Sequence, residues 1–220
     1  MTDDRPGHDR PDSRGRTGLH QTGRDLDRNP DVMIRDVEVT SDGWHVLRRT
    51  TYDYRHPDGH WESQQRETYD RGNGATILLY DRERRTVLLT RQFRFPAYVN
   101  EHPDGMLIEA AAGLLDGEDP ETAIRREAGE ELGVEVGEVQ DIFDVFMSPG
   151  SVTERVHFYA APYVASDRTV DRAGIADEGE HIEILELPFD QALAMVADGR
   201  IADGKTIMLL YWAALHGPFA

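Results

Sequence analysis

Hydrophobic and polar positions alternate over the early part of the chain. From Met33 to Tyr54, apolar side chains recur at every second position over short stretches, which is typical of half-buried β-strands. The segment His56–Gly59 is rich in turn-forming residues, and Trp61–Tyr69 comes after it as a more polar strand. We therefore expect residues 31–71 to form a small antiparallel β subdomain.

The remainder, residues 72–220, mixes short apolar runs with amphipathic segments. The pattern predicts strands at Ala75–Tyr80, Thr86–Arg91, Met106–Ala112, Val156–Val164 and His181–Leu187, and helices between Asp119 and Gly133, at Phe189–Ala197 and at Asp203–His216. The segment Val134–Met147 connects the first of these helices to a turn at Ser148–Gly150. A long polar loop is expected at Ala165–Gly179. This order favours the α/β class, as an α/β/α sandwich in which helices cover both faces of a mixed sheet.

The helix after residue 118 carries the clearest start and stop signals of the chain. Asp119 is a typical N-cap residue, and Pro120 suits the first helical position. An apolar residue recurs every four positions, at Ile124, Ala128 and Leu132. Gly133 then supplies the left-handed residue with which many helices end.

Three carboxylates crowd one side of this predicted helix. At about 100° per residue, Glu127, Glu130 and Glu131 share an arc of roughly 100° beside the apolar stripe. Such an arc on its own is more typical of a solvated acidic face. The mutual repulsion of the three carboxylates can also be offset by a hard divalent cation such as Mg²⁺, which binds oxygen ligands.

Composition and charge narrow the choice of partners. The 220 residues carry a formal net charge of −18, which disfavours a nucleic-acid partner. The absence of cysteine excludes disulfides, zinc–thiolate sites and a thiol nucleophile. The longest apolar run, Ile207–Leu215, is far shorter than the roughly 20 residues that span a bilayer. The first residues contain no hydrophobic stretch, so we expect no secretory signal. We expect a soluble cytoplasmic protein without a membrane partner.

Residues 1–30 differ in composition from the rest of the chain. They hold six Asp, six Arg, four Gly and three Pro, with Met1, Leu19 and Leu26 as the apolar residues. So few apolar groups cannot offset the entropy of ordering, and we predict a disordered tail without net charge. The alternative, a basic arm that binds nucleic acid, is disfavoured because the charges balance.

Residues 126–134, REAGEELGV, fill every fixed position of the REUxEExGU half of the Nudix signature. The chain thus resembles the Nudix hydrolases, which cleave a nucleoside diphosphate linked to another group and use Mg²⁺ or Mn²⁺. The other half of the signature departs from the pattern. Ala112 occupies the position where the signature begins with a glycine, and the glycine of this chain is the next residue, Gly113. The loop from Gly113 to Glu118 is therefore one residue shorter than usual.

The resemblance implies roles for the acidic residues. Glu127 and Glu131 are expected to bind the metal together with the backbone carbonyl of Ala112. Glu130 either binds a second ion or supports the ligands, and both roles stay open. Glu180, which directly precedes the last predicted strand, is expected to be the base that deprotonates the attacking water. It is also expected to be a further metal ligand. Glu178 is the alternative base.

The similarity runs from about residue 33 nearly to the end of the chain. Segments such as TYDRGNGATILLYD, AGLLD, FMSPGSVTERVHF and DGKTIMLLYW look like the bacterial GDP-mannose hydrolases, a sister group of the ADP-ribose pyrophosphatases. That subgroup implies substrate contacts at Trp44, Arg66, Glu67, Arg94, Gly113, Leu114, Glu154 and Lys205. It also implies a homodimer in which the N-terminal strands are exchanged.

Two positions depart from the subgroup. Gln65 stands where a lysine is usual, and Trp44 stands where a base-stacking tyrosine is usual, although a tryptophan ring can also stack. Arg66 and Glu67 could equally form surface pairs with side chains of a neighbouring strand. Lys205 has support of its own, because it is the single lysine beside 23 arginines. Chance retention at a helix start is the alternative.

Three functions remain as hypotheses. The leading one is Mg²⁺-dependent hydrolysis of a nucleoside diphosphate sugar, GDP-mannose, to GMP and mannose 1-phosphate. The second is hydrolysis of ADP-ribose. The third is a non-catalytic nucleotide-sugar sensor, against which the complete set of Glu127, Glu130 and Glu131 argues.

Overall fold

The computed structural model of the chain describes residues 26, 28–164, 172–173 and 181–220. Most of the predicted tail at 1–30 and of the loop at Ala165–Gly179 lies outside the described residues. Within the described part, no helix is both long and apolar enough to cross a membrane.

The described chain divides into two compact units. The first unit gathers residues up to Asn73 together with Leu115–Gly117 and Val145–Val156. The second unit holds Gly74–Leu114, Glu118–Asp144 and His157–Ala220. The predicted domain boundaries stay predictions.

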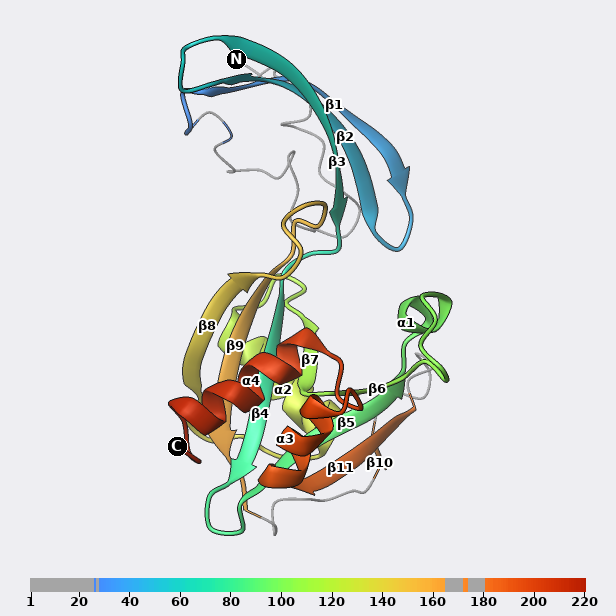
Figure 1. The fold of residues 1–220 in the computed structure, drawn as a ribbon, viewed down its shortest axis with the longest axis vertical. Helices are drawn as coiled ribbons and strands as arrows, with labels where there is room; N and C mark the ends of the chain where they lie inside the picture. Colours follow the sequence, from blue (N-terminus) through green and yellow to red (C-terminus); the bar gives the residue numbers. More distant parts are fainter. Residues whose placement is uncertain (1–25, 27, 165–171, 174–180) are drawn as a thin grey trace. The chain divides into compact units, whose positions relative to one another are not determined.

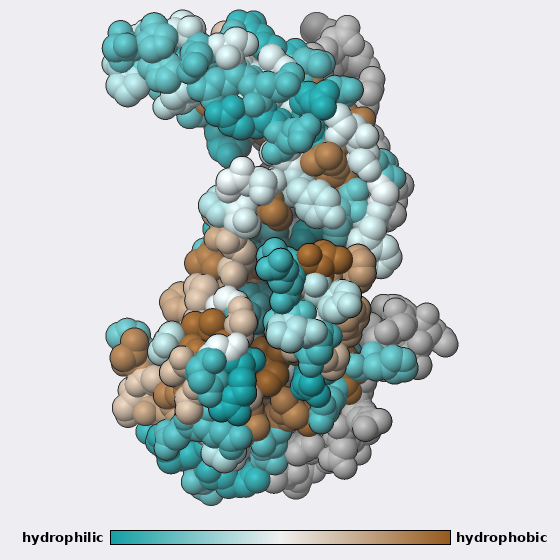
Figure 2. All heavy atoms as spheres, turned by 45° about the vertical axis from the view of Figure 1, so that its right-hand side comes forward, coloured by the Kyte–Doolittle hydropathy of each residue, from teal (hydrophilic) through white to brown (hydrophobic). Residues whose placement is uncertain are grey.

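A three-stranded antiparallel sheet makes up most of the first unit (Figure 1). Its strands are β1 (Val32–Asp42), β2 (Val46–Arg55) and β3 (Trp61–Asp70), in that spatial order. Arg48 of β2 donates to Asp70 of β3 at 2.8 Å, and both side chains are buried. The face of this sheet that Figure 2 shows is mainly hydrophilic. The predicted antiparallel strands are thus present, with a buried ion pair in place of a large apolar core.

The second unit is built on a larger sheet whose main path runs β10-β11-β5-β4-β9-β8. These strands are β4 (Gly74–Asp81), β5 (Thr86–Phe93), β8 (Gln140–Phe146), β9 (Arg155–Pro162), β10 (Arg172–Ala173) and β11 (Ile182–Pro188). The ends of β8 and β9 reach into residues counted with the first unit. β5 is antiparallel to β4 and β11, whereas β9 runs in the same direction as β4 in Figure 1, so the sheet is mixed.

The segment predicted as one strand at Met106–Ala112 is two strands. β6 (Met106–Glu109) pairs with β5, and β7 (Ala111–Leu114) pairs with β4. At the junction, the backbone N–H of Ala110 donates to the hydroxyl of Thr206 at 2.7 Å instead of to a neighbouring strand. The prediction was wrong because this hydrogen bond comes from a helix almost a hundred residues away.

Helices lie on both faces of this sheet. Figure 1 shows α3 (Phe189–Ala197) and α4 (Gly204–Leu215) in front of the strands and α2 (Pro120–Leu132) behind them. All three were predicted, whereas the short helix α1 (Phe95–Val99), which has proline in its first turn, was not. The layers confirm the predicted α/β class with an additional antiparallel sheet.

The segment Val134–Met147, which follows α2, contains strand β8, and this strand begins at Gln140. The guanidinium of Arg125, on α2, donates to the backbone carbonyls of Val136 and Gly137. These carbonyls are therefore satisfied by a side chain rather than by a neighbouring strand. Residues 133–139 serve as a connection that returns the chain from α2 to the sheet.

Candidate active site

Helix α2 is fixed at both ends in the way that its sequence predicts. The Asp119 carboxylate accepts the N–H of Thr122 at 3.0 Å, and hydrogen bonds from Thr122 lower the pKa of Asp119. Gly133 ends the helix with φ at 65°, in the left-handed region. The apolar stripe of Ile124, Ala128 and Leu132 is buried, which confirms the predicted inward face of the helix.

Glu131 is held against the backbone of β7. Its side chain is buried, and Oε2 accepts the N–H of Ala112 at 3.0 Å. A charged carboxylate is costly to bury unless hydrogen bonds or opposite charges compensate it. The helix and the β7 strand are therefore locked together at the carboxylate that the sequence assigned to the metal.

Glu127, one turn earlier, lies directly over Gly113. An added Cβ at Gly113 would come within 2.0 Å of Glu127 Oε1 and 2.1 Å of its Cδ. Such contacts are far shorter than van der Waals distance, so only glycine lets the carboxylate lie against β7. Gly113 lies one residue away from the usual glycine position of the Nudix signature. Its lack of a side chain is needed at this position, because a Cβ would clash with Glu127.

Arg126 lies among the carboxylates of the same helix. Its guanidinium donates to Glu127 at 3.0 Å, to Glu130 at 2.9 Å and to Glu118 at 3.2 Å. Partial burial alone would lower the pKa of Arg126, but these carboxylates outweigh it and raise the pKa above its usual value. Arg126 therefore stays cationic and offsets part of the repulsion within the acidic cluster.

The donor set on α2 and β7 suits a hard divalent cation. It consists of carboxylate and carbonyl oxygens, and Mg²⁺ typically takes one or two carboxylates and completes its shell with water and phosphate oxygens. Glu127 and Glu131 are the side chains that would hold the ion, with the carbonyl of Ala112. No three acidic or histidine side chains of the described residues form a complete cage by themselves. The ion would thus also need water, substrate or a residue outside that part.

Two of the predicted substrate ligands meet at a residue that the sequence did not single out. Arg94 Nε donates to Glu109 Oε2 at 2.7 Å, and Lys205 Nζ lies 3.7 Å from Glu109 Oε1. Lys205 also donates to Asp203 at 2.6 Å. Glu109 was detectable in principle, because it is a lone carboxylate within the apolar run MLIEAAAGL.

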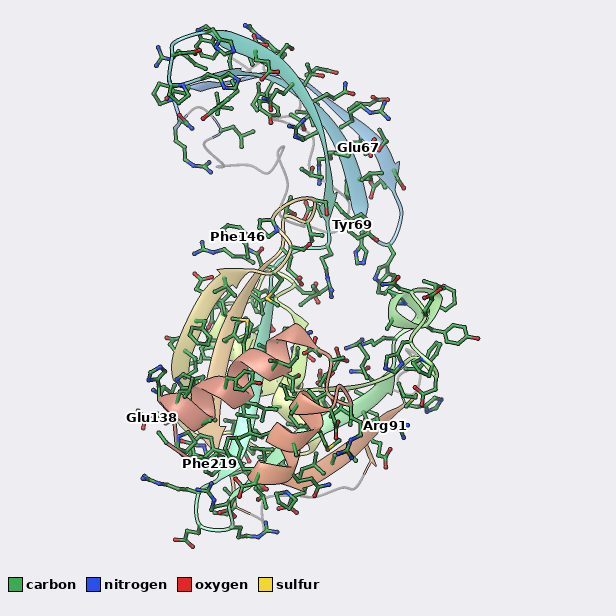
Figure 3. The ribbon with its side chains drawn as sticks, viewed as in Figure 1. Glu67, Tyr69, Arg91, Glu138, Phe146 and Phe219 are labelled. Carbon is green, nitrogen blue, oxygen red and sulfur yellow. The ribbon has the colours of Figure 1, made fainter. Side chains whose placement is uncertain are left out.

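Four further predicted ligands belong to the first unit. Trp44 is 79% exposed, and Glu154 forms a 3.4 Å ion pair with Arg71. Glu67, on β3 in Figure 3, accepts from Arg49 of the neighbouring strand at 3.2 Å. Arg66 donates to the backbone carbonyl of Gln65. The cross-strand alternative therefore describes Glu67 in this structure, with Arg49 of β2 as its partner.

The predicted base, Glu180, and its alternative, Glu178, lie outside the described residues. Their roles stay predictions. Gly113 and Leu114 lie on β7, where they pair with Ala75 and Gly74 of β4. Their predicted contact with substrate likewise stays a prediction.

Two family models together match nearly the whole described chain. Residues 70–210 match the model of the NUDIX domain, and residues 31–69 match the model described as the GDP-mannose pyrophosphatase NudK N-terminal domain. A GDP-mannose pyrophosphatase of Yersinia enterocolitica is 56% identical over 188 residues, which is 84% of this chain and 97% of the relative. One of Klebsiella pneumoniae is 54% identical, over 84% of this chain and 92% of the relative.

A solved structure described as an ADP compounds hydrolase shares the fold. It superposes with a TM-score of 0.64 over 86% of this chain and 97% of that chain, at 17% sequence identity. At that identity the likeness concerns the fold alone.

The contact of Gly113 with Glu127 yields a first prediction. Gly113→Ala should displace the Glu127 carboxylate and weaken Mn²⁺ binding by about tenfold or more, measured by titration calorimetry. The matched control is Gly129→Ala, at an exposed helical position where a Cβ meets nothing within 4 Å. It should leave Mn²⁺ affinity unchanged and raise the free energy of unfolding by about 0.5–1 kcal/mol. Equal Mn²⁺ affinity of Gly113→Ala and the unmutated protein would contradict the assignment of Glu127.

Proposed function

This chain belongs to the NUDIX family, and from that premise we propose that it hydrolyses the pyrophosphate bond of a nucleoside diphosphate sugar. One observation carries the proposal: two glutamates one helical turn apart lie against the short strand β7. Glu131 is held there by the N–H of Ala112, and Glu127 fits there because Gly113 has no Cβ. Oxygen ligands grouped in this way suit a metal that binds phosphate.

The proposed substrate is GDP-mannose, with GMP and mannose 1-phosphate as products. Support comes from relatives named GDP-mannose pyrophosphatase that are more than half identical over 84% of this chain. Further support comes from the N-terminal match, because residues 31–69 fit a model described by the same activity. ADP-ribose is the second candidate, and a sensor without turnover is the third.

A divalent cation is implied by the family, and we propose Mg²⁺, with Mn²⁺ as the alternative. When bound, such an ion lowers the pKa of a water molecule and neutralises charge on phosphate oxygens. Glu127, Glu131 and the carbonyl of Ala112 would hold it. Glu130 has two proposed roles, as a ligand of a second ion or as a support through Arg126, with which it forms a 2.9 Å hydrogen bond.

The reaction joins a water oxygen to one phosphorus and breaks the bond from that phosphorus to the bridging oxygen. The proposed base, Glu180, accepts the proton that the water loses. Arg94 and Lys205 are proposed to bind phosphate oxygens, and their side chains are partly exposed, as that role requires. Positioning and charge stabilisation supply most of the acceleration in such reactions.

The residues proposed to recognise base and sugar are taken from the family resemblance. Trp44 would stack on the base, and its 79% exposure is compatible with stacking. Contacts of Arg66, Glu67, Glu154, Gly113 and Leu114 are carried over from the family resemblance. Glu67 would exchange its partner Arg49 for the substrate, because the two are paired in this structure.

A homodimer is proposed from the small sheet. In the described part of the chain, the apolar side chains that β1–β3 bury are Val37 and Val46. Three strands with so little apolar burial are marginal alone, and pairing with a second copy would add buried surface. The exchange of N-terminal strands between copies rests on the family resemblance.

The substrate assignment is tested with purified protein. With Mg²⁺ and GDP-mannose we expect release of GMP and mannose 1-phosphate, faster than release of AMP from ADP-ribose, followed by chromatography. Chelation with EDTA should stop the reaction, and added Mg²⁺ should restore it. If ADP-ribose turned over faster than GDP-mannose, the second candidate would replace the first.

Catalysis is separated from sensing by Glu131→Gln. The amide oxygen of Gln can still accept the N–H of Ala112, so the fold should persist while one charged ligand is lost. We expect kcat to fall by about a hundredfold or more, with GDP-mannose affinity within about threefold of the unmutated protein. Glu135→Gln, at an exposed position four residues on, is the matched control with unchanged kcat. An unmutated protein that binds GDP-mannose without turnover would favour the sensor.

The oligomeric state is tested by light scattering. At micromolar concentration we expect twice the 24.9 kDa mass of one chain. Removal of residues 1–30 should leave the dimer intact, since the proposed interface is formed by the strands. The mass of a single chain at that concentration would overturn the dimer.

A further inference from the structure

Glu109 is a buried carboxylate that is not among the proposed metal ligands. It is the last residue of β6, and its side chain is 5% exposed. Its neighbours in the chain, Ile108 and Ala110, are buried and apolar. Burying a carboxylate in such surroundings costs free energy unless cations or hydrogen bonds compensate it, so its partners explain why it can stand there.

Its two partners are cations from distant parts of the sequence. Arg94, just before α1, contacts Oε2, and Lys205, in the first turn of α4, faces Oε1. Each oxygen of the one carboxylate thus faces a different cation. The side chain of Arg94 is 37% exposed and that of Lys205 is 22% exposed. Each cation therefore contacts the buried Glu109 carboxylate and remains partly accessible from solvent.

We propose that Glu109 is a positioning residue that fixes the distance between the Arg94 guanidinium and the Lys205 ammonium, so that together they fit the two phosphate groups of a diphosphate. This inference rests on the proposed function. Arg94 uses Nε for Glu109, and among the described residues its two Nη groups have no hydrogen-bond partner, so they can bind phosphate oxygens. Two cations separated by a rigid carboxylate span a longer anion than either cation could bind alone.

The backbone around Glu109 is held as firmly as its side chain. The Glu109 carbonyl accepts from the Thr90 hydroxyl at 3.1 Å. The next N–H, of Ala110, donates to Thr206, and the Thr206 hydroxyl donates to Asp203 at 2.7 Å. Because Thr206 follows Lys205 directly, this chain of hydrogen bonds fixes the start of α4 relative to Glu109.

The placement of Lys205 also needs compensation. A cation in the first turn of a helix opposes the helix dipole. The carboxylates of Asp203, at 2.6 Å, and Glu109, at 3.7 Å, offset that repulsion. A buried ion pair is weak evidence for a stabilising role, since apolar residues of similar volume often stabilise as well. A role in placing two cations accounts for a carboxylate at this position better than stability does.

The test is the Glu109→Gln variant, in which one oxygen becomes an NH₂ group that repels whichever cation it faces. We expect KM for the hydrolysed diphosphate substrate to rise about tenfold, with kcat within about threefold. In an Arg94→Gln background, Glu109→Gln should raise KM little further, because Glu109 acts by positioning Arg94 and Lys205. The control variant Glu186→Gln changes a less deeply buried glutamate that is also paired with an arginine, Arg84. It should lower the melting temperature without changing KM.

Affinity for inorganic pyrophosphate, measured by calorimetry, separates this inference from the proposed function. If the unmutated protein hydrolyses no nucleotide sugar, the function fails, and a tenfold loss of pyrophosphate affinity in Glu109→Gln still supports the positioning role. If the protein is active and Glu109→Gln changes only stability, or lowers kcat alone, the positioning role is overturned while the function stands. Additive effects of Glu109→Gln and Arg94→Gln on KM would also overturn it.

Discussion

The close approach of α2 to β7 is the constraint on which the site depends. Like-charged carboxylates on one helix face repel each other, and they are brought against a strand that offers no cationic side chain of its own. The approach is achieved by a glycine that leaves room for Glu127, an N–H that binds Glu131, and Arg126, which bonds to three carboxylates. Where β7 starts is therefore as important as which residues α2 carries.

The start of β7 is set by interactions that no local pattern contains. The apolar run from Met106 reads as one strand, because a period of two cannot reveal that the chain changes partner from β5 to β4. The change occurs where Ala110 bonds to Thr206. By contrast, the start and end of α2 were predictable, since Asp119, Pro120 and Gly133 act within a few residues of their own positions.

The candidate site shows the same division between local and distant information. Periodicity placed Glu127 and Glu131 on one helix face, and the structure brings both to β7. The family resemblance indicated Arg94 and Lys205, but not that they share Glu109. A single carboxylate within an apolar strand carries no periodic signal. Glu180 was assigned from the resemblance and lies outside the described residues.

The position of Arg126 has a consequence for how the protein matures. Many small metal-binding domains fold only when the ion arrives, because their ligands would otherwise repel or stay unsatisfied. Here the guanidinium of Arg126 already lies among the acidic side chains of α2. The helix can therefore form in the absence of metal. Metal availability would then govern activity rather than the survival of the chain.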